Sequence, residues 1–319
     1  MPGSMAGNAQ TGFSALADEW LGWKRTELKA SSMTRYTDIV NCLLLPYFGG
    51  KEVVAVTRSE AARYAQWLLS EGNSRGGGLS PRTAATVLSV LKSILHYAGQ
   101  IRGLAVADLK GVAVRQPVQP LRVFTVGEQQ RLCRHLLQRR DPCSIGIVLA
   151  LYTGLRLGEL CALRWAHISL EERCLTVRET MQRLPIPGEE KKTAVVLSTP
   201  KSPSSLRTIP LPEGICEILA GIRAPGDCYL LTGDERYIEP RSLENRFKAA
   251  LRICGIEPAG FHICRHSFAT RCVELGFDVK SLSEILGHSS VNMTMNRYVH
   301  PSMEFKRENM KRLDALMEL

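Results

Sequence analysis

The sequence predicts a mainly α-helical protein of two domains, with one small antiparallel β-sheet in the second domain. Its length of 319 residues suggests about two domains. Apolar residues recur at helical spacing through the first hundred residues, whereas three short segments rich in β-branched residues lie between positions 173 and 211. Hydrophobic residues make up 45% of the chain, enough for both domains to bury a core without disulfides.

The first domain is expected to be a bundle of four helices. The first helix is expected within FSALADEWLGWKRTEL, whose apolar residues at helical spacing are Phe13, Leu16, Trp20 and Trp23. SMTRYTDIVNCLLLPYF and SEAARYAQWLLSEG carry the second and third helices, and the loop NSRGGGLS follows them. The fourth, SPRTAATVLSVLKSILHYAG, has Ser80 as its N-cap and Pro81 as its first residue, where a missing N–H costs nothing.

A break in the helical periodicity separates the two domains. Residues 103–121 contain two prolines and show weak periodicity, so we expect a linker there. Thr125 and Glu128 then form a capping-box pattern at the head of the second domain. The linker separates a helical domain at residues 12–102 from a mixed domain at residues 122–319. Residues 1–11, before the helical domain, are expected to be disordered.

Three strands are expected in the second domain, with helical patterns after them to the end of the chain. The segments RCLTVRET, TAVVLST and LRTIPL are rich in β-branched residues. The last two flank PKSPSS, whose Pro and Ser content predicts a turn. These two segments are therefore expected to form a hairpin with Lys201 at its tip.

The composition restricts the partners and the compartment. Lys and Arg exceed Asp and Glu by ten, which favours an anionic partner such as nucleic acid, an acidic membrane surface or an acidic protein. No run of about 18 apolar residues is available to span a membrane, and the N-terminus MPGSMAGNAQ lacks the pattern of a secretory signal. The ten cysteines include no CxxC pair, which favours free thiols in a reducing cytoplasm over a zinc ribbon or a disulfide scaffold.

Several polar side chains of the second domain have an ordinary explanation when each is taken alone. Arg156, in LYTGLRLGEL, can be held by Glu159 three residues on, and Lys201 can be a solvated turn lysine. His262 and His266, in FHICRH, share a helix face at the spacing of an HExxH zinc site. Isoleucine occupies the position of the catalytic glutamate of that motif, so a core or capping histidine is the simpler explanation.

Taken together, these residues suit chemistry on a phosphodiester. Arg, Lys, His, Arg, His and Tyr follow one another at positions 156, 201, 262, 265, 288 and 298. Two guanidiniums can clamp the non-bridging oxygens of the transition state, where negative charge accumulates. A tyrosine phenol can attack phosphorus once it loses its proton, and lysine or histidine can protonate the leaving 5′-oxygen. The sequence offers no carboxylate cluster for magnesium, and this chemistry needs none.

The content and order of these motifs resemble the tyrosine recombinases, which are the phage-integrase-type site-specific recombinases. TGLRLGEL, TPKSPSSLRTIPL, FHICRHSFAT and LGHSSVNMTMNRYVH match the family's motif blocks in the family's order. The second His/Arg block is particularly close to Xer-type and transposon integrases. The resemblance covers essentially the whole chain, and it implies a SAM-like helical core-binding domain followed by an α+β catalytic domain.

The resemblance assigns chemical roles to these residues. Tyr298 resembles the nucleophile that forms a 3′-phosphotyrosyl link to DNA. Arg156 and Arg265 resemble the pair that binds the scissile phosphate, and Lys201 resembles the general acid for the 5′-hydroxyl. The site is thus expected to combine a covalent nucleophile, a phosphate clamp and a proton donor.

Three further residues match supporting positions of the family. His262 resembles the acid/base residue near the tyrosine, His288 the second phosphate-binding histidine, and Glu159 the acidic residue that supports the first arginine. One departure is Cys264, where the family commonly has leucine, and we expect it to change packing rather than chemistry. Another is the N-terminus, where about a dozen residues precede the first helix, too few for the arm-binding domain of many phage and transposon integrases.

The resemblance also implies the partners. Strand exchange passes through a Holliday junction without metal, ATP or any other cofactor, because the phosphotyrosine stores the bond. The implied partners are double-stranded DNA carrying specific recombination sites, further copies of the chain in a homotetramer, and an accessory factor such as an excisionase. The amphipathic tail, about residues 302–319, has an apolar stripe that must be buried. The resemblance implies that it packs on a neighbouring protomer, and packing on its own domain is the alternative. A bacterial or phage-encoded, nucleoid-associated protein of the cytoplasm fits these partners.

The fourth helix of the first domain is the candidate for contacts with DNA. Arg82 lies near its N-terminus, where side chains and N–H groups suit phosphates, and Lys92 lies further along. The alternative is a solvated basic face. Which bases are read does not follow from these residues.

Integration or excision of a mobile element is the expected function, and three alternatives can be compared with it. Resolution of chromosome or plasmid dimers by an Xer-like enzyme uses the same chemistry and stays open. A non-catalytic DNA-binding protein explains the charge and the helices, but not the presence of all six chemical positions. A type IB topoisomerase shares the active-site chemistry, but the Xer-like blocks and the tail helix favour a recombinase.

Overall fold

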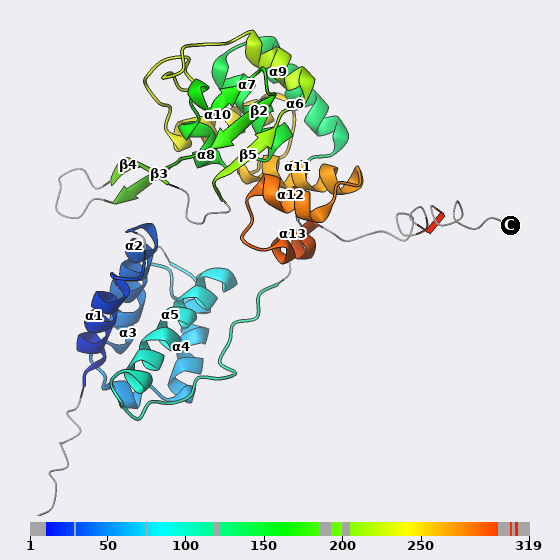
Figure 1. Ribbon diagram of the computed structural model, residues 1–319. Coiled ribbons are helices and arrows are strands. Elements are labelled where there is room, and N and C mark those ends of the chain that lie inside the picture. The colour runs from blue at the N-terminus through cyan, green and yellow to red at the C-terminus, as the bar shows by residue number, and fades with distance from the viewer. Residues whose placement is uncertain are drawn as a thin grey trace, which may run out of the picture. The chain divides into compact units, whose positions relative to one another are not determined.

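The computed structural model describes residues 11–28, 30–74, 76–117, 121–185, 193–199, 205–298, 307 and 310–311. The chain divides into two compact units, Met1–Gln119 and Pro120–Leu319, called unit 1 and unit 2 below (Figure 1). Unit 1 is built of helices, and unit 2 combines helices with short antiparallel strands. The mainly α-helical class with little sheet is therefore confirmed.

The helices of unit 1 begin where the sequence provides their caps. They are α1 (Phe13–Lys24), α2 (Ala30–Ile39), α3 (Leu45–Phe48), α4 (Arg58–Ser70) and α5 (Pro81–Gln100), with a π-helical turn at Val40–Leu44 and a 3-10 turn at Val53–Ala55. Ser80 Oγ accepts a hydrogen bond from the Thr83 amide at 3.2 Å, and Pro81 follows as the first residue of α5. Thr57 Oγ1 caps α4 in the same way through the Glu60 amide.

Aromatic side chains fill the core of unit 1. Trp20 of α1, Phe48 of α3 and Tyr64 of α4 are fully buried, and α5 packs against α1, α2 and α4. Leu109 and Val112 are buried in the same core. Part of the segment for which a linker is expected therefore packs on unit 1.

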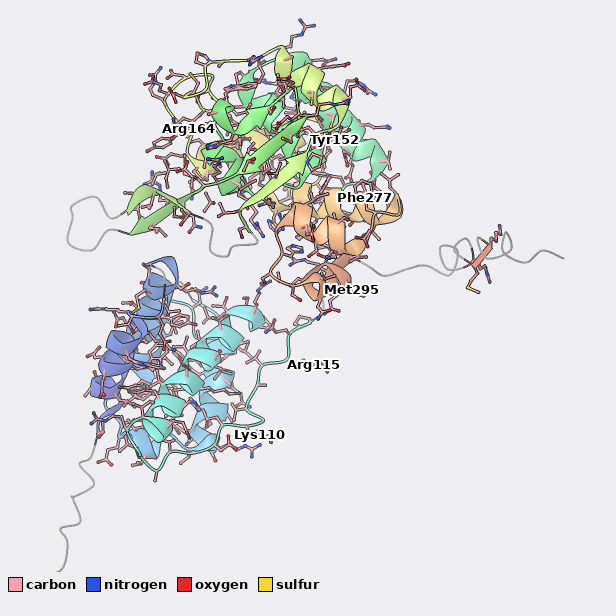
Figure 2. The ribbon with its side chains drawn as sticks, in the orientation of Figure 1. Lys110, Arg115, Tyr152, Arg164, Phe277 and Met295 are labelled. Atoms are coloured by element: carbon pink, nitrogen blue, oxygen red, sulfur yellow. The ribbon has the colours of Figure 1, made fainter. Side chains whose placement is uncertain are left out.

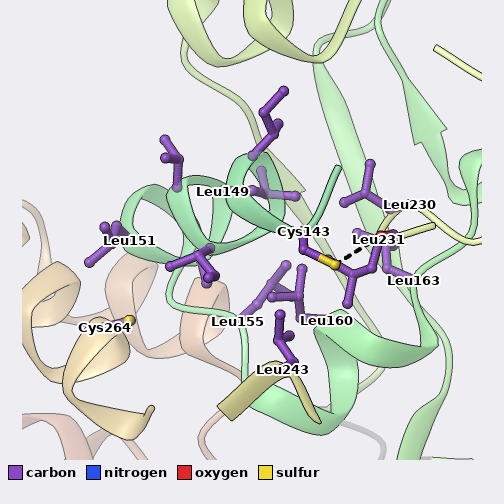
Figure 3. Close-up of a cluster of buried hydrophobic side chains, with 14 of the residues drawn as sticks. Cys143, Leu149, Leu151, Leu155, Leu160, Leu163, Leu230, Leu231, Leu243 and Cys264 are labelled. Carbon is purple, nitrogen blue, oxygen red and sulfur yellow. Dashed lines mark hydrogen bonds between the residues drawn. The ribbon is translucent and has the colours of Figure 1, made fainter. Parts of the chain in front are cut away.

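Unit 2 is organised around α7, whose sequence PCSIGIVLALYT is apolar on all sides, as expected of a buried helix. Helices α6, α9 and α11 pack against it. Figure 3 shows the leucine-rich cluster around α7, in which Cys143 Sγ donates a hydrogen bond to the Leu231 carbonyl at 3.1 Å. The helices are α6 (Val126–Arg139), α7 (Pro142–Thr153), α8 (Leu157–Ala162), α9 (Glu213–Ala220), α10 (Pro240–Ile253), α11 (His262–Glu274), α12 (Val279–Leu286) and α13 (Val291–Tyr298), with a 3-10 turn at Trp165–His167.

The capping box expected at the head of unit 2 is present at the start of α6. Thr125 Oγ1 accepts from the Glu128 amide at 3.1 Å, and the Glu128 carboxylate accepts from the Thr125 amide at 2.8 Å. Two otherwise unsatisfied N–H groups are thereby paired.

The described strands of unit 2 form two ladders. One sheet has the order β1-β2-β5, and the other pairs β3 with β4. In the first, Leu175 lies opposite Ile209 and Val177 opposite Arg207; in the second, Thr180 lies opposite Ser198. The strands are β1 (Ile168–Ser169), β2 (Cys174–Val177), β3 (Thr180–Pro185), β4 (Thr193–Ser198) and β5 (Arg207–Pro210).

The expected hairpin of TAVVLST with LRTIPL is therefore wrong. β4 pairs with β3, and β5 pairs with β2, so the segment that contains Lys201 connects two ladders. The β-branched residues identified the strands, but their partners depend on tertiary packing. RCLTVRET covers β2 and ends at the first residue of β3, so the sequence pattern merged two strands into one. Lys201 itself lies outside the described residues.

Candidate active site

Arg156 occupies the junction of two helices. Helix α7 ends at Gly154, which has φ 66° and donates its N–H to the Ala150 carbonyl at 3.0 Å. Arg156 is the N-cap residue of α8, and its amide donates to the Glu159 carboxylate at 3.0 Å. Its guanidinium Nη1 reaches the same carboxylate at 2.6 Å. Glu159 therefore fixes both the main chain and the side chain of Arg156.

A second arginine holds Glu159 from the other side. Arg207 of β5 donates to the two carboxylate oxygens at 3.1 and 2.8 Å, and both residues are buried, with 8% and 4% of their surface exposed. Burial alone would raise the pKa of Glu159, but the hydrogen bonds and charges of Arg207 and Arg156 outweigh it and hold the pKa at about 2. The carboxylate is therefore ionised throughout the physiological range.

Arg265 is the most buried arginine of the site, with 1% of its surface exposed. It lies on α11 and donates to the carbonyls of Gly154 at 3.0 Å and Leu286 at 2.7 Å. Burial, followed by the positive charge of Arg156, lowers its pKa to about 9. The guanidinium remains charged at neutral pH although its described hydrogen-bond partners are neutral carbonyls.

Three arginines converge on the C-terminal end of α12. Arg207 Nε donates to the Ile285 carbonyl at 2.6 Å, Arg265 Nη2 to Leu286 at 2.7 Å, and Arg156 Nη2 to Gly287 at 3.3 Å. The last carbonyls of a helix lack intrahelical partners and carry partial negative charge, so cations stabilise this end. Gly287 ends α12 with φ 65°, and His288 follows directly. The end of α12 thus positions the guanidiniums and His288 together.

The histidines and the tyrosine lie beside this arginine group. His266 Nδ1 lies 2.8 Å from the hydroxyl of Tyr298, which is buried at the end of α13. His288 Nδ1 lies 2.7 Å from the hydroxyl of the buried Thr294, and its ring is nearly parallel to that of Tyr298, with centroids 6.4 Å apart. The rings of His262 and His266 meet at an angle of 84°, with centroids 4.6 Å apart.

The surroundings keep these imidazoles neutral. Burial lowers the pKa of His266 to about 3 and that of His288 to about 4, and the neighbouring positive charges act in the same direction. The surrounding protein and Arg265 also lower the pKa of His262, whose side chain is the most exposed of the three. Burial raises the pKa of Tyr298, although Arg265, the largest opposing charge, counteracts it. At neutral pH the site holds neutral imidazoles and a protonated phenol.

Six of the residues selected from the sequence thus meet in unit 2, with one more outside the described residues. The six are Arg156, Glu159, His262, Arg265, His288 and Tyr298, and the seventh is Lys201. The two DNA-contact candidates are in unit 1, where Arg82 is exposed and Lys92 half-buried on α5. In the part of the chain that the structure describes, no three His, Cys, Asp or Glu residues are grouped so as to hold a metal ion.

Three residues of the site were not selected from the sequence. Arg207 has a signal, because alternation along β5 puts it on the buried face with Ile209, and an inward arginine requires a partner. The sequence pattern explains His266 as a core or capping histidine or as a zinc ligand with His262, and it assigns no role to Arg297. Arg297 Nη2 lies 3.3 Å from His266 Nε2. The contacts of His266 with Tyr298 and with Arg297 do not follow from residue spacing, because each of them joins α11 to α13.

Family models match both units. The model of the phage integrase family matches residues 130–304, and that of the phage integrase N-terminal SAM-like domain matches residues 12–69. The XerC-like tyrosine recombinase of Caldanaerobacter subterraneus is 27% identical over 84% of this chain and 73% of its own length. The tyrosine recombinase XerA of Pyrococcus furiosus is 33% identical over 77% of this chain and 79% of its own.

Solved structures share the fold. The Tn1549 transposon integrase in complex with a circular intermediate DNA has a TM-score of 0.74 at 22% identity, over 93% of this chain and 99% of that one. A lambda integrase tetramer bound to a Holliday junction has a TM-score of 0.63 at 15% identity, over 94% and 82%. None of the described helices is long and apolar enough to cross a bilayer. By its sequence matches and its fold, the chain belongs to the phage integrase family, the tyrosine recombinases.

Proposed function

We propose that this protein is a site-specific DNA recombinase that cuts and rejoins duplex DNA through a covalent 3′-phosphotyrosyl link to Tyr298. The observation that carries the proposal is the excess positive charge around Arg265. Arg156, Arg207 and Arg265 converge on α12, yet Glu159 is the one carboxylate that hydrogen-bonds to them among the described residues. Buried charge that is not balanced by the protein favours an anion, and a DNA phosphate supplies one.

The cleavage step makes use of this charge. The scissile phosphate binds Arg156 and Arg265, whose planar guanidiniums present paired donors to its non-bridging oxygens. Tyr298 Oη forms a bond to phosphorus while the bond from phosphorus to the 5′-oxygen breaks. Negative charge grows on the non-bridging oxygens during this step, so the fixed cations stabilise the transition state more than the bound substrate.

Proton transfers complete the step. Lys201 gives a proton to the leaving 5′-oxygen, and His262 takes the phenol proton of Tyr298. His288 is the second phosphate-binding histidine, held by its hydrogen bond to Thr294. The roles of Lys201, His262 and His288 rest on the motif match, and the neutral state of His262 at pH 7 suits a base.

Religation reverses the chemistry with a new partner. A 5′-hydroxyl of the second duplex attacks the phosphotyrosine, one phosphodiester replaces another, and neither metal nor ATP is consumed. Two rounds of exchange proceed through a Holliday junction. The protein therefore acts as a DNA strand-transferase on duplex DNA that carries its recombination sites.

Helix α5 of unit 1 is proposed as a DNA-contacting element. Arg82, Thr86, Ser89, Ser93 and His96 follow one another at helical spacing and form a polar face opposite the buried apolar one. Lys92 borders a hollow of about 620 Å³ next to this face, together with Lys110. Such a face suits contacts with phosphates, which position a protein on DNA without reading its sequence.

A homotetramer on DNA is proposed as the working assembly. Apolar side chains are exposed around the end of α11 and along α13, among them Leu275, Phe277, Met293 and Met295. Figure 2 labels Phe277 and Met295. Apolar side chains grouped at a surface are typical of contacts with another protein chain. An excisionase-type accessory factor and an intracellular, nucleoid-associated location belong to the same proposal.

Integration or excision of a mobile element is the proposed biological task. The sequence blocks match transposon and phage integrases, and the fold matches the Tn1549 transposon integrase. Resolution of chromosome or plasmid dimers is the second candidate, favoured by the 33% identity to a XerA recombinase. A recombination site in the flanks of an element that carries the gene supports the first, and one near the replication terminus or on a plasmid supports the second.

A covalent-adduct assay tests the proposal. Duplexes selected for binding from a fragment pool that includes the gene's own flanks would be nicked, so that the cleaved piece diffuses away. We expect a denaturant-resistant protein–DNA species without metal or ATP, and none with Tyr298→Phe at unchanged DNA binding. Tyr237→Phe, which alters an exposed tyrosine on unit 2, serves as the matched control. Tight binding without an adduct would contradict the proposal and favour a non-catalytic DNA-binding protein.

A further inference from the structure

His266 and Arg297 are polar side chains near the Tyr298 hydroxyl for which the proposed function provides no role. His266 follows Arg265 on α11 and is 8% exposed, and Arg297 directly precedes Tyr298 on α13. His266 Nδ1 lies 2.8 Å from Tyr298 Oη, and His266 Nε2 lies 3.3 Å from Arg297 Nη2. One imidazole therefore bridges the proposed nucleophile and the residue that precedes it in the chain.

The contact with Arg297 decides which ring nitrogen carries the proton. A guanidinium only donates hydrogen bonds, so His266 Nε2 must accept and cannot hold a proton. A neutral imidazole has a single N–H, which must then be on Nδ1, facing Tyr298 Oη. A doubly protonated ring would direct its Nε2–H against the N–H groups of Arg297. His266 therefore donates to the phenol oxygen and cannot accept the phenol proton at Nδ1.

We propose that His266 is a catalytic residue that stabilises the Tyr298 phenolate with its Nδ1–H, and that Arg297 is a positioning residue that selects this tautomer. This inference rests on the proposed function, because it takes Tyr298 as the nucleophile. The phenol proton leaves to His262, Tyr298 Oη bonds to phosphorus, and the bond from phosphorus to the 5′-oxygen breaks. Lys201 then protonates that oxygen, so every proton has a donor and an acceptor within the chain.

The hydrogen bond strengthens as the reaction proceeds. A donor binds an oxyanion more strongly than a neutral phenol, so His266 stabilises the phenolate more than the resting tyrosine. Such a donor does not itself change charge, and it stays aimed at the atom on which charge develops. Charged and titratable groups on several elements act on His266 and Tyr298. His262 and Arg265 lie on α11, Arg297 on α13, Arg156 at the N-cap of α8 and His288 directly after the end of α12.

The tautomer can be measured without DNA. In ¹⁵N NMR of the full chain labelled on histidine, we expect His266 to carry its proton on Nδ1 at pH 7, with the signal assigned by its loss in His266→Asn. Arg297→Lys keeps a donor and should preserve the tautomer, whereas Arg297→Met should raise the Nε2–H population severalfold. A ring protonated on Nε2 in the unaltered protein would overturn the inference.

The catalytic role is measured by the pH dependence of adduct formation on a nicked duplex that carries the recombination site. His266→Phe should slow the reaction by about tenfold to a hundredfold, the loss expected for a hydrogen bond to a charged group, and shift its pH profile toward alkaline pH. His266→Asn, whose side-chain N–H can replace Nδ1–H, should recover most of the rate. Arg297→Met should give an intermediate loss, and Arg297→Lys little loss.

The outcomes separate this inference from the proposed function. An unchanged rate and pH profile in His266→Phe, or an equal loss at every pH that His266→Asn does not repair, would overturn the role of His266 alone. Failure of the unaltered protein to form any adduct would overturn the proposed function and this catalytic role with it. The NMR result would in that case still report the tautomer.

Discussion

Glu159 is the residue on which the arrangement of the arginines depends. It accepts hydrogen bonds from the main chain and side chain of Arg156 and from both terminal nitrogens of Arg207. Because Glu159 is 4% exposed, water cannot readily take the place of its carboxylate as the acceptor of these hydrogen bonds. Removing its charge would leave two guanidiniums close together in a poorly solvated site, which is costly.

Glu159→Gln should therefore destabilise unit 2 by about 3 kcal/mol, the loss typical of breaking a buried ion pair. Urea unfolding at pH 7 measures this free energy. The matched control is Glu213→Gln, which removes an exposed carboxylate 3.8 Å from Arg173 and should cost less than about 1 kcal/mol. Equal losses in the two variants would contradict the role of Glu159.

Arg156→Lys should fail in catalysis while it still folds and binds DNA. A lysine keeps the charge but cannot hold Glu159 and the Gly287 carbonyl and also present paired donors to a phosphate. We expect adduct formation to fall about a hundredfold or more, as when a donor to a developing oxyanion is removed. Arg139→Lys, on the exposed last turn of α6, is the control. Near-normal adduct formation by Arg156→Lys would contradict the phosphate clamp.

The candidate catalytic residues could be identified from the sequence by their residue types and order. Some of the residues that hold them in place could not. Arg156 and Glu159 are three apart, and their contact was expected from helical spacing. Arg207, His266 and Arg297 act through contacts between elements distant in sequence. Such contacts depend on the packing of β5, α11 and α13, which the residue pattern does not determine.

At the scale of elements, close packing of α8 on β3 sets the position of Arg156 and Glu159. Gly158 lies in the first turn of α8, where an added Cβ would approach the Met181 carbonyl oxygen to 2.5 Å and Thr180 Oγ1 to 2.6 Å. The main chain of β3 cannot yield as a flexible side chain would. Glycine is needed here because of this approach, not because of its backbone conformation.

Gly158→Ala should therefore displace α8 from β3 and lower both the thermal midpoint and the rate of adduct formation. We expect a loss of about 1–3 kcal/mol, as for other overpacked sites. Gly214→Ala in α9 is the matched control, because its added Cβ meets nothing within 4 Å and alanine favours a helix. If Gly158→Ala were as stable and active as Gly214→Ala, the close approach of Gly158 to β3 would not be required for stability or activity.

The elements also show where sequence reasoning reaches its limit. The caps at Ser80 and at Thr125 with Glu128 were predicted because capping depends on residues three apart. The pairing of β4 was predicted wrongly, because strand partners are chosen by burial and cross-strand contacts. A turn-like composition at PKSPSS marked a connection, but not the strands that it connects.

On the scale of the whole molecule, the imidazoles that the fold holds neutral make unit 2 sensitive to acid. The pKa values of His266 and His288 lie at about 3 and 4, below the ordinary value near 6.5. As the pH falls below 6.5, the unfolded chain binds protons that the folded chain excludes, so the free energy of unfolding decreases until about pH 3–4. Glu159 acts in the same direction at lower pH, because its pKa of about 2 lies below its unfolded value.

Urea unfolding at a series of pH values between 7.5 and 4.5 should therefore show the free energy of unfolding decreasing once the pH falls below about 6.5. Each fully excluded proton contributes a slope of about 1.4 kcal/mol per pH unit. His288→Asn removes one such group and should flatten the dependence by up to this amount. The more exposed His262 should contribute less, because solvent screens it. An identical slope in His288→Asn would show that His288 is not held neutral.

The cluster of arginines at the end of α12 has a practical consequence for handling the protein. An unbalanced cationic site binds small anions as well as DNA, and any ligand of the folded state adds RT ln(1 + [L]/Kd) to its stability. Phosphate or sulfate in a buffer should thus act as a weak competitive inhibitor and as a thermal stabiliser, beyond what chloride achieves at equal ionic strength. The choice of buffer salt becomes an experimental variable that reports occupancy of the phosphate site before any recombination sequence is known.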